Sequence, residues 1–444
     1  MMRRSFLQVC GMGALGLTSI GSRAYVVGSK AGAVPRGSAR NLIMIQLEGA
    51  PSHVDTFDLK LGSWTPNDFE AANFGNLNMS AKLFPNLVNH TDKFSLLRCI
   101  NGTESVHTRA RYILDTCQSF NPSFAKEQPH IGSLIAYELE EQRQESHLLP
   151  TFLAFNTRVK SPGLLSSAYA GFPISAADGV AGLTHPDGEA LFHQRYASLL
   201  ALDTNRTKLA PTGAVITDHH AFYAGAERLL YQPELEGVFD VSEEDQARYG
   251  QTEVGLGCAL AVQALAVDSG ARFIQIAHGS WDAHQNIYNP ADNGSIYAKC
   301  AELDPAVSSL LEDLASKPGT LGGTLLDETM VIVAGEFGRT PGGLNNADGR
   351  DHHPEAWSAL VAGGGIVPNQ VFGATNETGA TITDRFWSQG HLITANDLIA
   401  TAYSSLGIDW TKEIANTPSG RVYEYTPKYS GVAGYYTDIV EMFG

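Results

Sequence analysis

The chain has 444 residues, of which 43% are hydrophobic and 17% are charged, and its formal net charge is −17. This composition is typical of a folded protein with ample material for a core, in one large domain or two of ordinary size. The negative charge, with no basic patch, argues against nucleic acid or an anionic membrane as a partner. An anionic substrate stays compatible, because a metal ion or a few arginines can reverse the charge locally.

The N-terminus predicts an export signal. Arg3 and Arg4 precede a mildly apolar, glycine-rich stretch from Val9 to Ile20, and cleavage-site-like triplets follow at 22–24 and 31–33. This arrangement is typical of a twin-arginine signal, which export machinery reads when it moves folded proteins across a bacterial inner membrane. The alternative interpretation of these residues is a basic, disordered N-terminal tail. We predict a signal peptide and linker over residues 1–33, and a periplasmic or secreted mature protein.

No later segment approaches the roughly 20 apolar residues of a membrane span, so we expect no integral span in the mature form. Four cysteines lie beyond the signal, and in an oxidising compartment they could form up to two bridges, although a chain of this size does not need them. None has CxxC spacing, which disfavours a cysteine-based zinc site. They are Cys99, Cys117, Cys258 and Cys300.

Short apolar runs predict the strands of a mostly parallel sheet, and longer periodic or alanine-rich segments predict helices. The strands are expected at 41–47, 94–100, 149–154, 272–277, 330–334 and 359–365, with a short edge strand at 371–373. The helices are expected from about 103–105 to 117, and at 131–139, 249–267 and 394–406. We therefore predict a doubly wound α/β fold with helices on both sheet faces. It would form a single domain over residues 34–444, with an irregular insertion around 120–245.

Polar residues follow several of these strands at the point where each strand ends. In an open α/β sheet the carboxyl ends of the strands are the edge where ligands bind, so we expect these residues to converge. Asp282 and His284 are two apart on an extended segment, so they project to the same side and can reach one ion. The candidate metal ligands are Glu48, His53, Asp55, Asp282, His284, Glu336, Asp351, His352 and His353.

Oxygen and imidazole donors of this kind suit one or two divalent ions, and we consider Zn, Mn, Ca and Fe. Each group alone also fits a plainer interpretation, as a salt bridge, a hydrogen-bonded turn or a solvated histidine pair. The combination of these groups at the ends of several strands favours a metal site over the plainer interpretations.

Catalytic roles are predicted for four residues. Ser105 and Thr108 lie near the start of a helix, where the local field favours anions, so either could be a nucleophile, or the hydroxyls there could only cap the helix. His107 would be a general acid or an additional ligand. Arg339 would hold an anion or neutralise charge that develops on a transferred group.

With these motifs in view, the chain resembles the DUF1501 family, exported proteins related to the alkaline phosphatase and sulfatase superfamily. The resemblance spans nearly the whole chain. It rests on the twin-arginine start and on Gly49-Ala50-Pro51-Ser52-His53-Val54-Asp55-Thr56-Phe57-Asp58, Tyr249-Gly250-Gln251-Thr252, Ser280-Trp281-Asp282-Ala283-His284, Gly335-Glu336-Phe337-Gly338-Arg339-Thr340-Pro341 and Gly349-Arg350-Asp351-His352-His353-Pro354.

The resemblance implies a doubly wound core in which one or two divalent ions activate a Ser, Thr or modified Cys nucleophile against a phosphate or sulfate ester. By position, Asp282 and His284 with His352 or His353 would hold one ion. Glu336 with Glu48 or Asp55 would serve a second.

The chain also departs from the superfamily pattern. Glu336-Phe337 stands where Asp or Asp-His is usual, Ala50 replaces a common glycine, and no Cys-x-Pro-x-Arg motif follows Cys99 or Cys117. The fold could therefore be retained with altered chemistry.

The first functional hypothesis is an exported, metal-dependent hydrolase of phosphate or sulfate esters, with a small-molecule or glycan ester as substrate. The second is a non-catalytic exported protein of the same fold that binds a metal or glycan or assists assembly. A redox enzyme is a weaker third, because no dinucleotide or haem signature is present.

Overall fold

The computed structural model describes residues 26–29, 33–157, 161–178, 184, 186–204, 208, 212–428 and 436–444. The twin arginines and the apolar stretch of the predicted export signal lie outside these residues. None of the described helices combines the length and the apolar character needed to cross a membrane.

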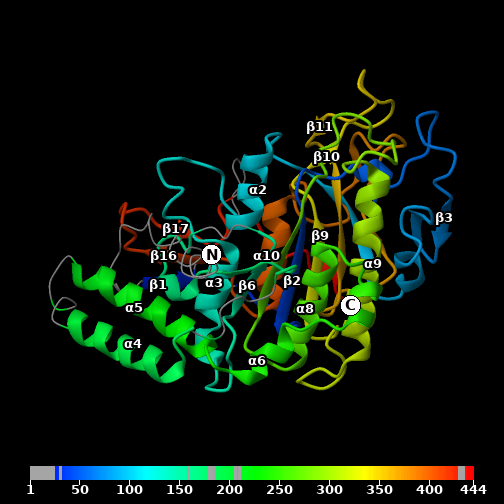
Figure 1. The fold of residues 1–444 in the computed structure, drawn as a ribbon. Helices are drawn as coiled ribbons and strands as arrows, with labels where there is room; N and C mark the ends of the chain where they lie inside the picture. Colours follow the sequence, from blue (N-terminus) through cyan, green and yellow to red (C-terminus); the bar gives the residue numbers. More distant parts are fainter. Residues whose placement is uncertain are drawn as a thin grey trace.

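An eight-stranded sheet forms the centre of the fold (Figure 1), in the order β13-β5-β12-β9-β2-β8-β6-β7. Neighbouring strands run parallel except β12, which is antiparallel to both β5 and β9. The strands are β2 (Asn41–Leu47), β5 (Phe94–Ile100), β6 (Phe152–Phe155), β7 (Phe172–Ile174), β8 (Phe273–His278), β9 (Thr329–Ala334), β12 (Trp357–Ala362) and β13 (Val371–Phe372).

Helices cover both faces of the sheet. On one side lie α2 (His107–Thr116), α3 (Ile131–Glu138) and α10 (Ala395–Ser405), and on the other α8 (Glu253–Ala266) and α9 (Ile296–Ser316) (Figure 1). Alternate residues of β2 enter the two cores, with Met44 in the first and Ile45 in the second. The central strands are buried on both faces, which explains their uninterrupted apolar sequences. The predicted doubly wound α/β fold is confirmed.

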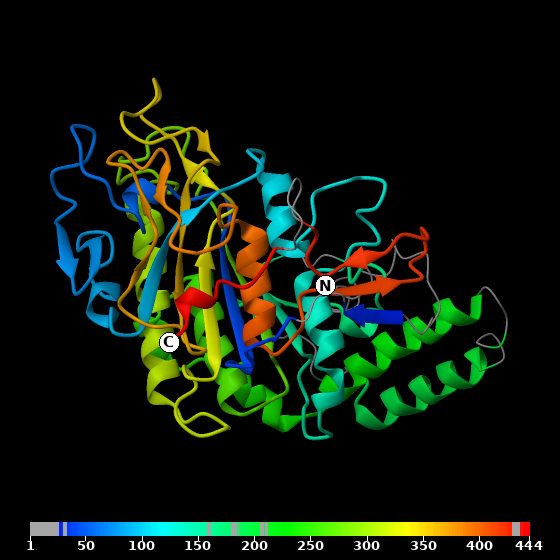
Figure 2. The same ribbon diagram turned by 180° about the vertical axis from the view of Figure 1, so that it is seen from behind.

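Smaller elements surround the sheet. The pair α4 and α5 extends away from it (Figure 2). The predicted insertion around 120–245 contains this pair and also contributes β6 and β7 to the central sheet. The further elements are β1 (Val26–Ser29), β3 (Ala71–Phe74), β4 (Leu77–Ser80), β10 (Gly338–Arg339), β11 (His352–His353), β14 (Ala374–Thr375), β15 (Ile382–Asp384), β16 (Lys412–Ala415), β17 (Tyr423–Glu424), α4 (Glu189–Asp203), α5 (Thr212–Leu229), α6 (Pro233–Val238) and α7 (Glu243–Arg248).

Short 3₁₀ turns complete the element order. They are η2 (His53–Asp55), η3 (Leu87–His90), η4 (Glu140–Gln142), η5 (Ser167–Tyr169) and η7 (Val440–Met442).

Two predicted helices differ from the structure. The helix expected from residue 103–105 begins at His107, after Val106 at its N-cap, and no side chain caps it. Instead, Gly102 N donates to Pro354 O at 2.7 Å, so the preceding segment pairs with a neighbouring loop. The helix expected at 249–267 begins at Glu253, because Gln251 takes a positive φ of 53°.

Cys99, Cys117, Cys258 and Cys300 are free and buried, so the bridges that the sequence allowed between them are not formed. We expect unfolding in denaturant without reductant to expose all four to a thiol reagent. The folded protein should react slowly, because burial removes the thiols from solvent and raises the pKa of Cys99 to about 12. A failure of any of these four thiols to react in the unfolded chain would contradict the structure.

Candidate metal centre

The topology brings four loops to one edge of the sheet. Strands β2, β5, β8 and β9 are parallel, so their carboxyl ends share that edge. Strand β12 runs the opposite way and begins there, with Trp357 opposite Ile100 at the end of β5. Residues 335–356 return directly from β9 to β12 without a helix, as an antiparallel neighbour allows. Histidines just before β12 therefore lie beside the ends of the parallel strands.

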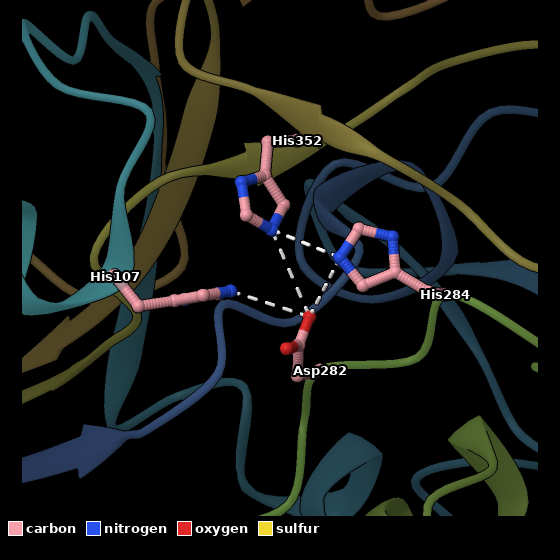
Figure 3. Close-up of side chains that lie close together, drawn as sticks. All are labelled: His107, Asp282, His284 and His352. Atoms are coloured by element: carbon pink, nitrogen blue, oxygen red, sulfur yellow. Dashed lines mark hydrogen bonds and ion pairs between the residues drawn. The ribbon is translucent and has the colours of Figure 1, made fainter.

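Four side chains from these loops converge at this edge (Figure 3): His107 at the start of α2, Asp282 and His284 after β8, and His352 on β11. One ligand atom from each lies within 4.8 Å of all the others. Asp282 Oδ1 is 3.2 Å from His107 Nε2, 3.1 Å from His284 Nε2 and 3.8 Å from His352 Nε2. The Nε2 atoms of His284 and His352 are 3.0 Å apart. We call these four residues the His-Asp cluster.

The second ring nitrogen of each histidine faces a hydrogen-bond acceptor. His107 Nδ1 is 2.8 Å from Glu336 Oε1, and His284 Nδ1 is 2.8 Å from Asp351 Oδ1. His352 Nδ1 is 2.6 Å from the main-chain oxygen of Ser105. An acceptor at Nδ1 places the proton there, so in the neutral rings all three Nε2 lone pairs point into the cluster.

The cluster fits a divalent metal ion. Metal-binding histidines usually donate their other ring N–H to a carboxylate or carbonyl, as all three do here. For zinc bonds of about 2.0–2.1 Å, tetrahedral ligand atoms lie about 3.3 Å apart, close to the four distances above. His107 Nε2 is buried and has no hydrogen-bond partner. Three imidazoles and one carboxylate suit Zn, Mn or Fe better than Ca, which prefers oxygen ligands.

Electrostatics keep these groups in their metal-binding forms. Burial would raise the pKa of Asp282, but the hydrogen bond and charge of Arg339, with His107 and His284 nearby, hold it below its usual value. Burial lowers the pKa of His352, with Arg339 contributing. Asp282 is therefore ionised and His352 neutral at neutral pH, as metal coordination requires.

Close backbone approach fixes the Asp282 turn. Gly49, just after β2, has φ of 103°, and a Cβ there would lie 2.6 Å from Asp282 N. Trp281 N donates to Glu48 O at 3.1 Å, which ties this turn to the end of β2. A glycine at position 49 lets the two strand ends meet.

Arg339 lies inside the framework of the site and is 1% exposed. Its guanidinium donates to the main-chain oxygens of Gly49, Ala50 and Arg350, to Asp282 Oδ1 and, at 3.4 Å, to His284 Nε2. These five contacts match the five N–H donors of an arginine. Arg339 thus joins three loops and orients Asp282, and its buried fork has no donor left for a substrate.

Other predicted ligands lie beside the cluster without entering it. Glu336 accepts hydrogen bonds from His107 and from Gly49 N, the latter at 3.0 Å. Asp351 supports His284, and that hydrogen bond lowers the pKa of Asp351. Glu48 pairs with Arg111 of α2 at 2.8 Å. Glu336 and Asp351 therefore act on the cluster through its histidines.

Three more predicted ligands are engaged elsewhere. Asp55 pairs with Arg350 at 2.8 Å, with both side chains 0% exposed, and accepts from Tyr288. His53 Nε2 is 2.8 Å from Gly379 O, and its Nδ1 accepts from Arg339 N. His353 Nε2 is 2.8 Å from Ala380 O.

The predicted nucleophiles, Ser105 and Thr108, are both exposed. Ser105 contacts the cluster through its main-chain oxygen on His352. Sequence reasoning also missed two polar contacts between α2 and the end of β2, in which Arg111 pairs with Glu48 and Asp115 accepts a hydrogen bond from Gln46. A glutamine within the apolar run of β2, and charged residues at four-residue spacing along α2, were the signals that could have found them.

His53 gives a pH test of this framework. Burial lowers its pKa from 6.5 to about 4. Between pH 6.5 and about 4, His53 is protonated in the unfolded chain but neutral in the folded chain. The contribution of His53 to the free energy of unfolding is therefore complete above pH 6.5 and decreases as the pH falls through this range. One pKa unit is worth about 1.4 kcal/mol, so His53 should contribute on the order of 3 kcal/mol to this loss.

We expect His53→Gln to flatten the acid side of the stability curve, measured by denaturant unfolding of metal-free protein from pH 7.5 to pH 4. Because other buried groups also titrate, the test is the difference between the stability curves of the wild-type protein and of His53→Gln. Parallel curves would show that His53 is not buried as a neutral ring.

Comparisons with known proteins give a family but no characterised close relative. Residues 39–429 match the family described as "Protein of unknown function (DUF1501)". No curated protein matches the sequence.

Three solved structures give the extent of the structural similarity. A protein in the alkaline phosphatase superfamily from Vibrio parahaemolyticus is 16% identical, with 92% of this chain and 76% of that one covered and a TM-score of 0.36. A phosphonate monoester hydrolase from Silicibacter pomeroyi is 12% identical, with 86% and 75% covered and a TM-score of 0.36. The C-terminal periplasmic domain of EcEptC from Escherichia coli, in complex with Zn, is 11% identical, with 88% and 87% covered and a TM-score of 0.33.

The match to the family covers most of the chain, including every residue of the His-Asp cluster. The predicted family is therefore confirmed, and this protein belongs to the DUF1501 family.

Proposed function

We propose that the protein is a metal-dependent hydrolase that acts on phosphate or sulfate esters, and that the His-Asp cluster holds its ion. One observation carries the proposal: three Nε2 lone pairs and a carboxylate oxygen face one another and share no hydrogen of their own, although Arg339 donates to Asp282 Oδ1 and His284 Nε2. Arg339 offsets part of the repulsion at those two atoms, whereas His107 Nε2 has no hydrogen-bond partner, so a further cation would stabilise the arrangement. The predicted catalytic roles of Ser105 and Thr108 belong to this proposal, and Arg339, whose five donors are engaged within the site, would contribute to it only through its charge.

His107, Asp282, His284 and His352 would hold the ion. A divalent ion there would polarise an ester oxygen and lower the pKa of an attacking water or hydroxyl. Glu336 and Asp351 hold the protons of His107 and His284 on Nδ1, which keeps both Nε2 atoms available. The side chains of Asp282 and His284 are 46% and 44% exposed, so one side of the cluster is open to a substrate.

The proposal predicts that one histidine of the His352-His353 pair binds metal and the other does not. We expect His352→Ala to weaken zinc binding by more than about 100-fold, because losing a ligand costs more than losing an outer-shell partner. The matched control, His353→Ala, removes an imidazole that lies outside the cluster and should leave zinc affinity unchanged. Calorimetry or competition with a chromophoric chelator gives both affinities.

Equal loss of affinity in the two variants would contradict the assignment of His352. Loss in His353→Ala alone would place the ion on the other side of β11.

Turnover separates the hydrolase from its main alternative. We expect purified protein loaded with zinc or manganese to hydrolyse 4-nitrophenyl phosphate or sulfate, and a chelator followed by added metal to abolish and restore the rate. His352→Ala should lose this activity. Stoichiometric metal with no turnover of either ester would exclude the hydrolase for these substrates.

That outcome would favour the second candidate, a non-catalytic metal-binding protein of the same fold. A specific observation supports it: among the described residues, no serine or threonine hydroxyl is hydrogen-bonded to a side chain of the His-Asp cluster. The saturated donors of Arg339 add to this, because anion binding would need another group.

A further inference from the structure

Helix α2 carries His107 and presents three polar residues to the ends of the central strands. His107, Arg111 and Asp115 are four residues apart, so they lie on one side of the helix, one turn above the other. Each contacts a different group from the sheet. Arg111 and Asp115 have no role in the proposed metal centre as described so far.

The three contacts have matching lengths. His107 Nδ1 is 2.8 Å from Glu336 Oε1, Arg111 Nη1 is 2.8 Å from Glu48 Oε2, and Gln46 Nε2 donates to Asp115 Oδ1 at 2.8 Å. We call these three contacts the α2 ladder.

The spacings of helix and strand agree along the ladder. Gln46 and Glu48 are two residues apart at the end of β2, a rise of about 6.6 Å along a strand. Arg111 and Asp115 are four residues apart, a rise of about 6.0 Å along a helix. The helix therefore runs back along β2 from the edge where the metal centre lies. The Arg111–Glu48 and Gln46–Asp115 contacts can form together because one alignment of helix and strand satisfies both.

The contact between Gln46 and Asp115, which lies farthest from His107 along α2, is the most buried of the three. Asp115, Gln46 and Gln275 are each 3% exposed. Gln275 Nε2 donates to Gln46 Oε1 at 2.7 Å and lies 3.4 Å from Asp115 Oδ1. His130 Nε2 is 3.5 Å from the same oxygen. Because His130 Nδ1 accepts from Gly132 N, its Nε2 carries the proton and faces Asp115.

Such a network fixes a register more strongly than apolar contacts would. Apolar side chains can slide past one another with small loss, whereas a shift of α2 by one turn would leave buried amide and carboxylate groups unpaired. The polar groups therefore permit one position of the helix along β2. The apolar core around them supplies the general stability of the contact between helix and sheet.

We propose that Asp115, with Gln46, is a positioning residue of the metal centre, which acts through α2 to set His107 Nε2 against Asp282. This inference rests on the proposed metal-binding function. Asp115 touches neither the ion nor a substrate. Its effect is to hold His107 at the 3.2 Å from Asp282 Oδ1 that a shared ion requires.

The test compares two buried carboxylates. Asp115→Asn weakens the lowest contact of the α2 ladder, and we expect it to lower zinc affinity by about 10–100-fold, the range for outer-shell partners. The control, Asp304→Asn, alters a carboxylate that is 1% exposed and accepts from Leu87 N and Asn86 Nδ2 outside the ladder. It should lower the thermal stability of the metal-free protein and leave zinc affinity unchanged.

A second variant covers the case in which Asp115→Asn does not fold. Arg111 and Glu48 are about one-quarter exposed at the side chain, so Arg111→Met should change the stability of the metal-free protein little. It should nevertheless weaken zinc binding and alter the visible absorption of the cobalt-loaded protein, which reports coordination geometry. A residue with only a structural role would not move that spectrum.

Zinc affinity and cobalt spectra equal to wild type in both Asp115→Asn and Arg111→Met would overturn the positioning role while leaving the metal centre intact. Wild-type protein that binds no zinc and no cobalt would overturn both proposals, and the wild-type titration alone reports this.

Discussion

The site depends on one electrostatic constraint, the convergence of three imidazole nitrogens and one carboxylate oxygen that share no hydrogen of their own. The guanidinium of Arg339 donates to two of these four atoms. Each imidazole is fixed by an acceptor at its other nitrogen, so no ring can rotate to relieve the repulsion without breaking a hydrogen bond of 2.6–2.8 Å. A divalent cation at the proposed centre would resolve this repulsion, and the carboxylates of Glu336 and Asp351 would add favourable negative charge around it.

The fold supplies this convergence through its strand directions. Parallel strands bring the loops after β2, β5, β8 and β9 to one edge, and the single antiparallel strand, β12, returns the late histidine pair to the same place. Two buried arginines then join the loops. Arg339 links the loops after β2, β8 and β9, and Arg350 links Asp55 to the main chain at Thr340 and Gly342. These hydrogen bonds would hold the ligands of the proposed metal centre in place before any ion binds.

Much of this could be predicted from the sequence, because it depends on local pattern. Apolar runs located the central strands, and the two-residue spacing of Asp282 and His284 placed both on one side of an extended segment. The choice between His352 and His353 could not be made, since it depends on a two-residue strand. β11 pairs with Gly338 and Arg339, and its alternation sends His352 to the cluster and His353 toward His53.

The roles of the acidic residues could not be predicted for a different reason. Glu48 and Asp55 resemble metal ligands in sequence, but their charges are met by Arg111 and Arg350, which lie far along the chain. Such pairing depends on tertiary structure and leaves no local signal. The start of α2 at His107 could not be predicted from the sequence either, because no side chain caps the helix and the preceding loop instead pairs through its main chain with a neighbouring loop.

The most direct measurement is an anomalous-scattering map from crystals of the metal-loaded protein, recorded on both sides of the absorption edge of the metal. The account predicts one peak within bonding distance, about 2.0–2.2 Å, of His107 Nε2, Asp282 Oδ1, His284 Nε2 and His352 Nε2. A peak elsewhere, or none among these four atoms in crystals soaked with zinc, would contradict it.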